Sequence, residues 1–119
     1  MAPVVIAFIR GSHLVRGVKA FLSLTMGEGV ILEREPTNPV DPNAVKVFNA
    51  TNEPVGYADY LSARILASHI DAGVIYSAYV ISAPKIKFGK YVQDSCRMKC
   101  IPIFKVKENE NRDVPVPVL

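Results

Sequence analysis

Short runs in which hydrophobic and polar residues alternate fill most of this chain. A period of two is typical of half-buried β-strands, and these runs are rich in the β-branched and aromatic residues that favour strands. The turn-forming sequences MGEG (26–29) and ATNE (50–53) predict antiparallel neighbours. The pattern predicts a mainly β fold, a small antiparallel barrel of about six strands. The runs lie at residues 3–9, 19–25, 30–35, 44–49, 54–58, 74–83 and 96–107.

Residues 59–73 have the period of a helix instead. Large apolar side chains recur three and four positions apart, which places them on one helical face. They are Leu61, Ile65, Leu66 and Ile70. Asp59 or Ser62 suits the N-cap, and Gly73 suits the position just after the last turn. We expect this to be the main helix, and we expect its apolar face to meet the inward face of a strand in the core. The predicted core residues are Val45, Val47, Leu61, Ile65 and Leu66.

Composition limits the chain to one compact domain. Of its 119 residues, 50% are hydrophobic and 21% are charged, which is typical of a globular protein. We expect the domain to span residues 1–107, and residues 108–119, with alternating charge and two Val-Pro pairs, to form a flexible tail. No apolar run is long enough to span a membrane, and residues 4–9 lack the features of a signal peptide. We therefore expect an intracellular, cytoplasmic protein without membrane contact.

The sequence shows no arrangement typical of catalysis or metal binding. Cys96 and Cys100 lie four positions apart in a predicted strand, about 13 Å from each other, so they are expected to be buried thiols without a disulfide. His69 lacks a paired acid or nucleophile, and Glu33 and Glu35 are interpreted as a solvated strand face. We expect neither an enzyme nor a metal site, and no cofactor.

The sequence REPTNPVDPNAVKVFN (34–49) contains an unusually constrained turn. Its centre, residues 38–43, is called the elbow below. Pro39 and Pro42 fix φ and hold the residues before them extended, and the Asp41 carboxylate can accept a hydrogen bond from the backbone N–H of Asn43. The elbow is either a well-formed structural turn or a rigid mount for a functional group.

The elbow and its surroundings resemble the HIRAN domain family. The matching sequences are LEREPTNPVDPNAVKVFN (32–49) and EPVGYADYLSARILASHIDAG (53–73), which contain an Arg-Glu-Pro strand end, an Asn-Pro-x-Asp-x-Asn-Ala elbow, a strand, a Val-Gly pair and a helix. The resemblance implies a modified, OB-like β-barrel. Members of this family occur attached to fork-remodelling helicases or alone, and the best-studied kind holds the 3′-hydroxyl end of single-stranded DNA.

The resemblance also assigns residues. The acid that receives the terminal hydroxyl falls on Asp41, and the asparagine that helps to hold the DNA backbone falls on Asn38. A histidine of the relative falls on Tyr57, whose hydroxyl is expected to donate to a phosphate, and a lysine falls on Tyr60, without its charge. Val40 replaces a tyrosine that stacks on a base, a contact worth about 1–3 kcal/mol. An Arg-Tyr pair of the family has no clear counterpart here, and its candidate substitutes are Arg16, Lys19 and Phe21.

Positive charge is concentrated near the C-terminal end. Residues 83–107 carry seven basic residues and one acid, a formal charge of +6, whereas the whole chain is +3. Cations interleaved with aromatic rings are typical of grooves that bind single-stranded nucleic acid, although lysines also protect edge strands. The candidate binding residues in this segment are Lys85, Lys87, Phe88, Lys90 and Tyr91.

These observations favour a binding module that recognises single-stranded DNA or DNA 3′ ends in repair or replication. The alternative is a protein-interaction module that docks on a helicase or another protein of DNA metabolism without binding DNA itself. The loss of the stacking aromatic at Val40 favours the alternative.

Overall fold

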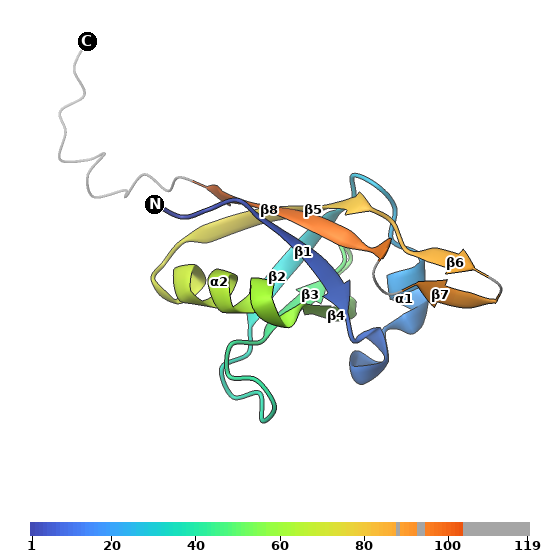
Figure 1. Cartoon of the computed structure of the whole chain (residues 1–119), viewed down its shortest axis with the longest axis horizontal. Coiled ribbons are helices and arrows are strands. Elements are labelled where there is room, and N and C mark those ends of the chain that lie inside the picture. Colours follow the sequence, from blue (N-terminus) through green and yellow to red (C-terminus); the bar gives the residue numbers. More distant parts are fainter. Residues whose placement is uncertain (88, 93–94, 104–119) are drawn as a thin grey trace, which may run out of the picture.

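Six antiparallel strands form a closed barrel in the computed structural model, which describes residues 1–87, 89–92 and 95–103, with the backbone alone at 86, 87 and 90–92. Their order around the barrel is β1-β4-β3-β2-β5-β8 (Figure 1). The predicted mainly β barrel with one main helix is confirmed. The strands are β1 (Val5–Arg10), β2 (Gly29–Arg34), β3 (Val45–Phe48), β4 (Pro54–Ala58), β5 (Ile75–Ser82) and β8 (Arg97–Ile103).

A small hairpin projects from the barrel between β5 and β8 (Figure 1). It consists of β6 (Lys85–Lys87) and β7 (Lys90–Val92), which pair with each other but not with the barrel strands. The predicted tail, residues 108–119, and the proposed domain boundary at 107 lie outside the described residues.

The period-two pattern sets the core. Val45 and Val47 of β3 are fully buried, as predicted, because successive side chains of a strand point to opposite faces and theirs point inward. Met98 and Cys100 of β8 follow the same rule. Cys96 is buried as well, and neither cysteine forms a disulfide, as expected. Burial raises the pKa of both thiols to about 12, so they are protonated and inert at neutral pH.

The prediction of a strand at residues 19–25 is wrong. This part of the chain forms a 3₁₀ turn, η1 (Ser12–Val15), and a short helix, α1 (Val18–Leu22). The apolar residues of the run also have helical spacing, and Phe21 and Leu24, three positions apart, are the ones that become buried. The MGEG sequence consequently leads from α1 into β2 and does not connect two strands.

The main helix, α2 (Tyr60–Asp71), begins and ends as predicted. The Asp59 side chain accepts a hydrogen bond from the Ser62 N–H, and Gly73 follows the helix with a φ of +98°. Figure 1 shows α2 packed beside β1. No helix in the described part of the chain is long and apolar enough to cross a membrane.

The predicted buried face of α2 is only partly right. Leu66 is buried, but Leu61 is 70% exposed and Ile65 is 46% exposed. Ala63 and Ala67 are buried with Leu66 instead. These three residues also have helical spacing, and alanines allow the helix backbone to approach the barrel more closely than leucine or isoleucine would. The face of α2 that carries the small alanine side chains therefore packs against the barrel.

Candidate functional site

The elbow is held by its own side chains. The Asn38 Oδ1 accepts hydrogen bonds from the N–H groups of Val40 (2.9 Å) and Asp41 (3.0 Å). The Asp41 Oδ1 accepts one from the Asn43 N–H at 2.9 Å, as the sequence predicted. Two Asx-type turns thus follow each other, with prolines at 39 and 42 restricting the intervening backbone. The turn is therefore held by its own hydrogen bonds and prolines, without a ligand.

Glu35 joins the elbow to the barrel. Its Oε1 accepts hydrogen bonds from Asn38 Nδ2 (2.7 Å) and from the Tyr57 hydroxyl (2.8 Å), and its Oε2 lies 3.9 Å from Lys46 Nζ. The interpretation of Glu35 as part of a solvated strand face is therefore wrong. The contacts with Lys46 and Tyr57 depend on β3 and β4, so the alternation of charges around Arg34 could not reveal them.

The pKa values reflect this network. The hydrogen bond from Asn38, followed by the Tyr57 bond and the nearby Lys46, lowers the pKa of Glu35 despite partial burial. Desolvation, together with the hydrogen bond and negative charge of Glu35, raises the pKa of Tyr57 to about 12. Glu35 is therefore an anion and Tyr57 a neutral donor across the physiological pH range. The predicted donation from Tyr57 to a phosphate would require this bond to break.

Arg34, at the end of β2, fixes the other side of the elbow. Its guanidinium donates to the backbone oxygens of Ala44 (2.7 Å) and Pro42 (3.0 Å). The same group donates to both carboxylate oxygens of Asp71 at 2.9 and 3.1 Å, and this pairing lowers the pKa of Asp71. One residue therefore connects the elbow, β2 and the end of α2.

Two groups of the elbow remain open to a ligand. The side chain of Val40 is 91% exposed at the tip. The Asp41 Oδ2 has no hydrogen bond to any of the described residues, whereas Oδ1 is held by Asn43. A fixed carboxylate with one free oxygen is suited to accept a hydrogen bond from a hydroxyl.

A row of polar side chains crosses the barrel beside Glu35. Lys46 of β3 pairs with Tyr57 of β4, and Tyr57 pairs with Arg10 of β1, so the three share one face of the sheet. The Arg10 guanidinium carbon lies 4.7 Å from the centre of the Phe8 ring, and Lys46 Nζ lies 5.5 Å from that of Phe48. The sequence analysis missed Arg10, although its place at the end of the first apolar run was a usable signal.

Gly56 allows this row to form. Its φ is +151°, and a Cβ at this position would lie 2.5 Å from the backbone oxygen of Arg10. Only glycine therefore lets β4 approach β1 this closely, next to Tyr57.

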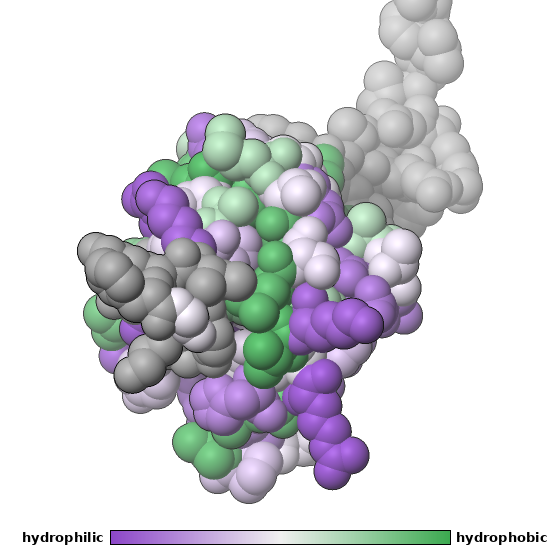
Figure 2. Space-filling view, turned by 90° about the vertical axis from the view of Figure 1, so that its right-hand side faces the viewer, coloured by the Kyte–Doolittle hydropathy of each residue, from purple (hydrophilic) through white to green (hydrophobic). Residues whose placement is uncertain are grey.

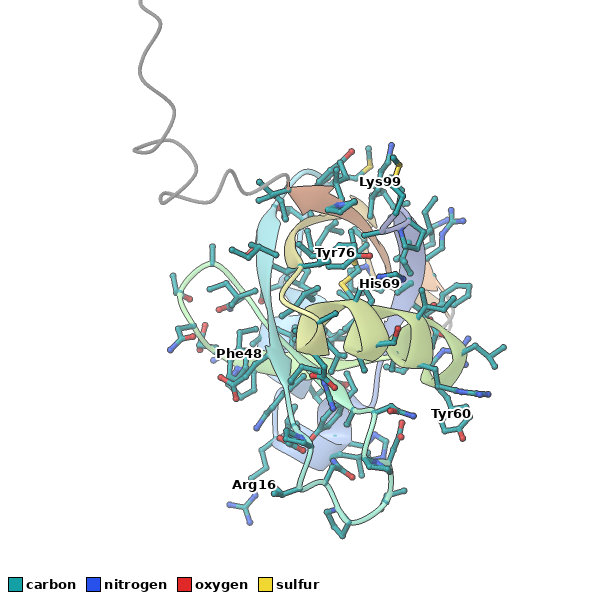
Figure 3. The ribbon with its side chains drawn as sticks, turned by 90° about the vertical axis from the view of Figure 1, so that its left-hand side faces the viewer. Arg16, Phe48, Tyr60, His69, Tyr76 and Lys99 are labelled. Atoms are coloured by element: carbon teal, nitrogen blue, oxygen red, sulfur yellow. The ribbon has the colours of Figure 1, made fainter. Side chains whose placement is uncertain are left out.

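The structure brings together some of the predicted site residues and separates others. Asn38, Asp41 and Tyr57 are linked through Glu35 and the elbow backbone. Tyr60 is 62% exposed on the first turn of α2 and lies on the side of the molecule opposite to Arg16 and Phe48 (Figure 3).

The predicted basic and aromatic residues of the hairpin are only partly described. Lys85 is exposed at the start of β6, and Lys87 pairs with Lys90 across the β6–β7 hairpin. The structure does not describe four of the predicted contacts, namely the side chains of Lys87, Lys90 and Tyr91 and all of Phe88.

The three substitutes proposed for the Arg-Tyr pair differ in exposure. Phe21 is only 1% exposed and cannot stack on a base. Arg16 and Lys19 are exposed and line a separate hollow. In the described part of the chain, no cluster of three or more histidine, cysteine or acidic side chains could hold a metal ion.

Comparison with known proteins agrees with this fold. The structure of the HIRAN domain of human HLTF is similar, with a TM-score of 0.62, 22% sequence identity, and coverage of 92% of this chain and 81% of that one. A protein from Lactobacillus plantarum gives a TM-score of 0.61 and 21% identity, with 82% of this chain and 96% of that one covered. No curated protein sequence matches significantly. The family model of the HIRAN domain matches residues 4–100, and the chain therefore belongs to the HIRAN domain family.

Proposed function

We propose that this protein binds single-stranded DNA and holds the free 3′ end of the strand at the elbow. Membership of the HIRAN family supports a DNA-binding module in general. The observation that carries the finer proposal is the Asp41 carboxylate, which is fixed through one oxygen and open at the other. HIRAN domains are binding modules, and the proposal includes no catalytic step.

The charges around the elbow favour a terminal hydroxyl over a terminal phosphate. A hydroxyl can donate a hydrogen bond to Asp41, whereas a terminal phosphate is an anion rich in acceptors and would approach two carboxylates, Asp41 and Glu35. Asn38 connects the two, because it donates to Glu35 and accepts from the Asp41 N–H. Because the elbow is already ordered, binding requires little further loss of conformational entropy.

The row of polar side chains beside the elbow is suited to bind the rest of the DNA strand. Arg10 and Lys46 can contact backbone phosphates, and Phe8 and Phe48, which lie under these cations, offer apolar surface for bases. Tyr57 keeps its bond to Glu35 and positions that carboxylate. Tyr60 lacks the charge for a strong phosphate contact, although its exposed hydroxyl can donate a hydrogen bond to one.

The β6–β7 hairpin supplies further contacts in this proposal. Lys85, Lys87 and Lys90 neutralise phosphates, and Phe88 and Tyr91 stack on bases. The concentration of positive charge in residues 83–107 supports this role. We assign the hairpin to affinity and not to recognition of the strand end, because phosphate contacts do not distinguish one end from another.

Fluorescence titration with short oligonucleotides tests the proposal. Three labelled strands of one sequence would carry a 3′-hydroxyl, a 3′-phosphate, or a 3′-hydroxyl with an added 5′-phosphate. We expect the 3′-phosphate to weaken binding and the 5′-phosphate to leave it unchanged. Equal affinities for all three strands would contradict end recognition, while the dependence on salt would still report DNA binding in general.

One observation favours the second candidate, a protein-interaction module. Leu61 and Ile65 are exposed side by side on α2 and border a shallow hollow of about 480 Å³ together with Arg64. This surface fits an apolar segment of a partner protein that carries a carboxylate opposite Arg64. A DNA-metabolism protein such as a helicase is the partner class we consider. Absence of oligonucleotide binding even at low salt would favour this candidate.

A further inference from the structure

The outer face of three neighbouring strands combines apolar side chains with positive charge. β1, β8 and β5 are adjacent in the barrel, and no residue of these three strands is acidic. Their side chains alternate between the core and the outside. The surface that points outward is called the outer sheet face below. It is defined by Ile6, Ile75, Tyr79, Arg97, Lys99 and Ile103.

One row across the strands places Lys99 at its centre. Lys99 of β8 pairs with Ile6 of β1 on one side and with Tyr79 of β5 on the other, so the three side chains share one face. Tyr79 pairs in turn with Gly29 of β2. Ile6 is 53% exposed, and a Cβ on Gly29 would meet no atom within 4 Å. The row therefore offers a cation between apolar neighbours, with open space at its end.

The cations of the outer sheet face have no counter-charge. Within the described residues, neither Arg97 nor Lys99 forms an ion pair or a side-chain hydrogen bond. They lie two residue steps apart on the same side of β8, which corresponds to roughly 7 Å along the strand. Two such charges favour a ligand that carries carboxylates. A symmetric contact between two copies, centred on this face, would instead bring like charges together.

An apolar hollow adjoins the outer sheet face where β8 ends. Its volume is about 540 Å³, and it forms between Ile103, the turn at residues 72–74 and residues 1–2. The Tyr76 hydroxyl donates a hydrogen bond of 2.9 Å to the backbone oxygen of Pro3, which holds the N-terminal segment beside β5. No charged side chain lines the hollow. It is therefore suited to receive a large apolar side chain.

The outer sheet face is remote from the elbow. Figure 1 shows β5 and β8 at the top of the barrel and the loop that contains the elbow below it. Lys99 lies at the end of the molecule opposite to Arg16 (Figure 3). On the side that carries α1 and the hairpin, hydrophobic side chains form only a narrow strip between hydrophilic ones (Figure 2). A ligand on the outer sheet face would leave the elbow accessible.

We propose that the outer sheet face and the adjoining hollow bind an extended, acidic and aliphatic segment of a partner protein. A large apolar side chain fills the hollow, and a carboxylate pairs with Lys99 and Arg97. Lys99 lies four residue steps, roughly 13 Å, from Ile103, and residues four apart in an extended segment lie on one side at the same distance. The acidic residue is therefore four positions from the apolar anchor. Isoleucine offers no stacking surface for bases, which favours a peptide over nucleic acid.

Fluorescence anisotropy with three labelled peptides of the same length tests this inference on the full chain. In all three, aliphatic and polar residues alternate. The first carries a leucine anchor and a glutamate four positions later, the second has lysine in place of the glutamate, and the third has serine in place of the leucine. We expect the first to bind about tenfold more tightly than the others, because only it matches both the hollow and the cations. Equal affinities for all three, or no binding, would overturn the inference.

Charge reversal locates the peptide on the protein. Lys99→Glu should reverse the preference from the glutamate peptide to the lysine peptide, and Arg97→Glu repeats the test in case Lys99→Glu lowers the melting temperature. Arg64→Glu is the matched control, because it makes the same change of charge at an exposed residue of α2 and should keep the original preference. Equal effects of Lys99→Glu and Arg64→Glu would show attraction by net charge alone and overturn the inference.

Two further measurements separate other occupants of the face. Displacement of the glutamate peptide by a single-stranded oligonucleotide would show that DNA covers the same surface, and would overturn a separate protein site. Sedimentation of the wild type as a dimer that Ile6→Glu dissociates would identify a second copy as the occupant, and would overturn the assignment to a partner. A monomer that binds the peptide and the oligonucleotide together would support it, whichever strand end the elbow prefers.

Discussion

The hydroxyl of Tyr57 donates a hydrogen bond of 2.8 Å to Oε1 of Glu35, which joins the middle of the barrel to the base of the elbow. The same oxygen accepts the amide of Asn38, whose carbonyl oxygen holds the N–H of Asp41. The position of Asp41 therefore depends on a carboxylate just before the elbow and on a phenol from β4.

Replacement of Tyr57 by phenylalanine should change how stability depends on pH. The pKa of Tyr57 is raised from 10.0 to about 12 in the folded protein, so the folded state binds the phenolic proton more tightly than the unfolded state does. This contribution is fully present below pH 10 and is lost as the pH rises towards 12. Urea unfolding at several pH values should show a steeper loss for the wild type than for Tyr57→Phe in this range. Parallel curves would mean that folding does not raise the pKa of Tyr57.

Removal of Arg34 should loosen the elbow. Arg34→Ala deletes the donors to Pro42, Ala44 and Asp71, and we expect it to lower the free energy of unfolding by about 1–3 kcal/mol. Arg34→Lys keeps the charge without the forked geometry and should recover only part of that loss. Urea unfolding measures both variants. Full stability in Arg34→Lys would show that charge alone suffices.

Two neighbouring residues of α2 should respond very differently to truncation. Leu66→Ala should cost about 2–5 kcal/mol, because Leu66 is completely buried. Ile65→Ala should cost only about 1 kcal/mol, because about half of the residue is exposed to solvent. Thermal or urea unfolding of the two variants compares them directly. A large loss for Ile65→Ala would mean that this face of the helix is covered in solution.

Neutralisation of the hairpin should weaken DNA binding without affecting its selectivity. Substitution of Lys85, Lys87 and Lys90 by glutamine removes three charges, and we expect the salt slope to fall by up to roughly 0.7 for each. The loss should be the same for different base sequences, because phosphate contacts carry no sequence information. Titrations at several salt concentrations measure both quantities. An unchanged slope would exclude these lysines from the interface.

Local patterns were sufficient for much of the fold. The alternating runs predicted most of the strands, and the elbow sequence predicted the hydrogen bond between Asp41 and Asn43, because both depend on residues close in the chain. The buried thiols followed from the same alternation.

The errors arose where tertiary contacts decide. Leu61 and Ile65 have helical spacing, but the face that contains Ala63 and Ala67 allowed closer packing. The role of Glu35 became apparent only because β4 placed Tyr57 beside it. Such pairings between distant strands are not encoded in any local pattern.

The most direct test of end recognition is the ratio of affinities for a 3′-hydroxyl and a 3′-phosphate strand, measured for the wild type and for Asp41→Asn. Asparagine can still accept the Asn43 N–H bond, so stability should stay within about 1 kcal/mol. Loss of the charge removes both the strong acceptor for the hydroxyl and the repulsion of the phosphate, so the ratio should fall by about tenfold or more. An unchanged ratio in Asp41→Asn, or a wild type without any preference, would contradict the central claim.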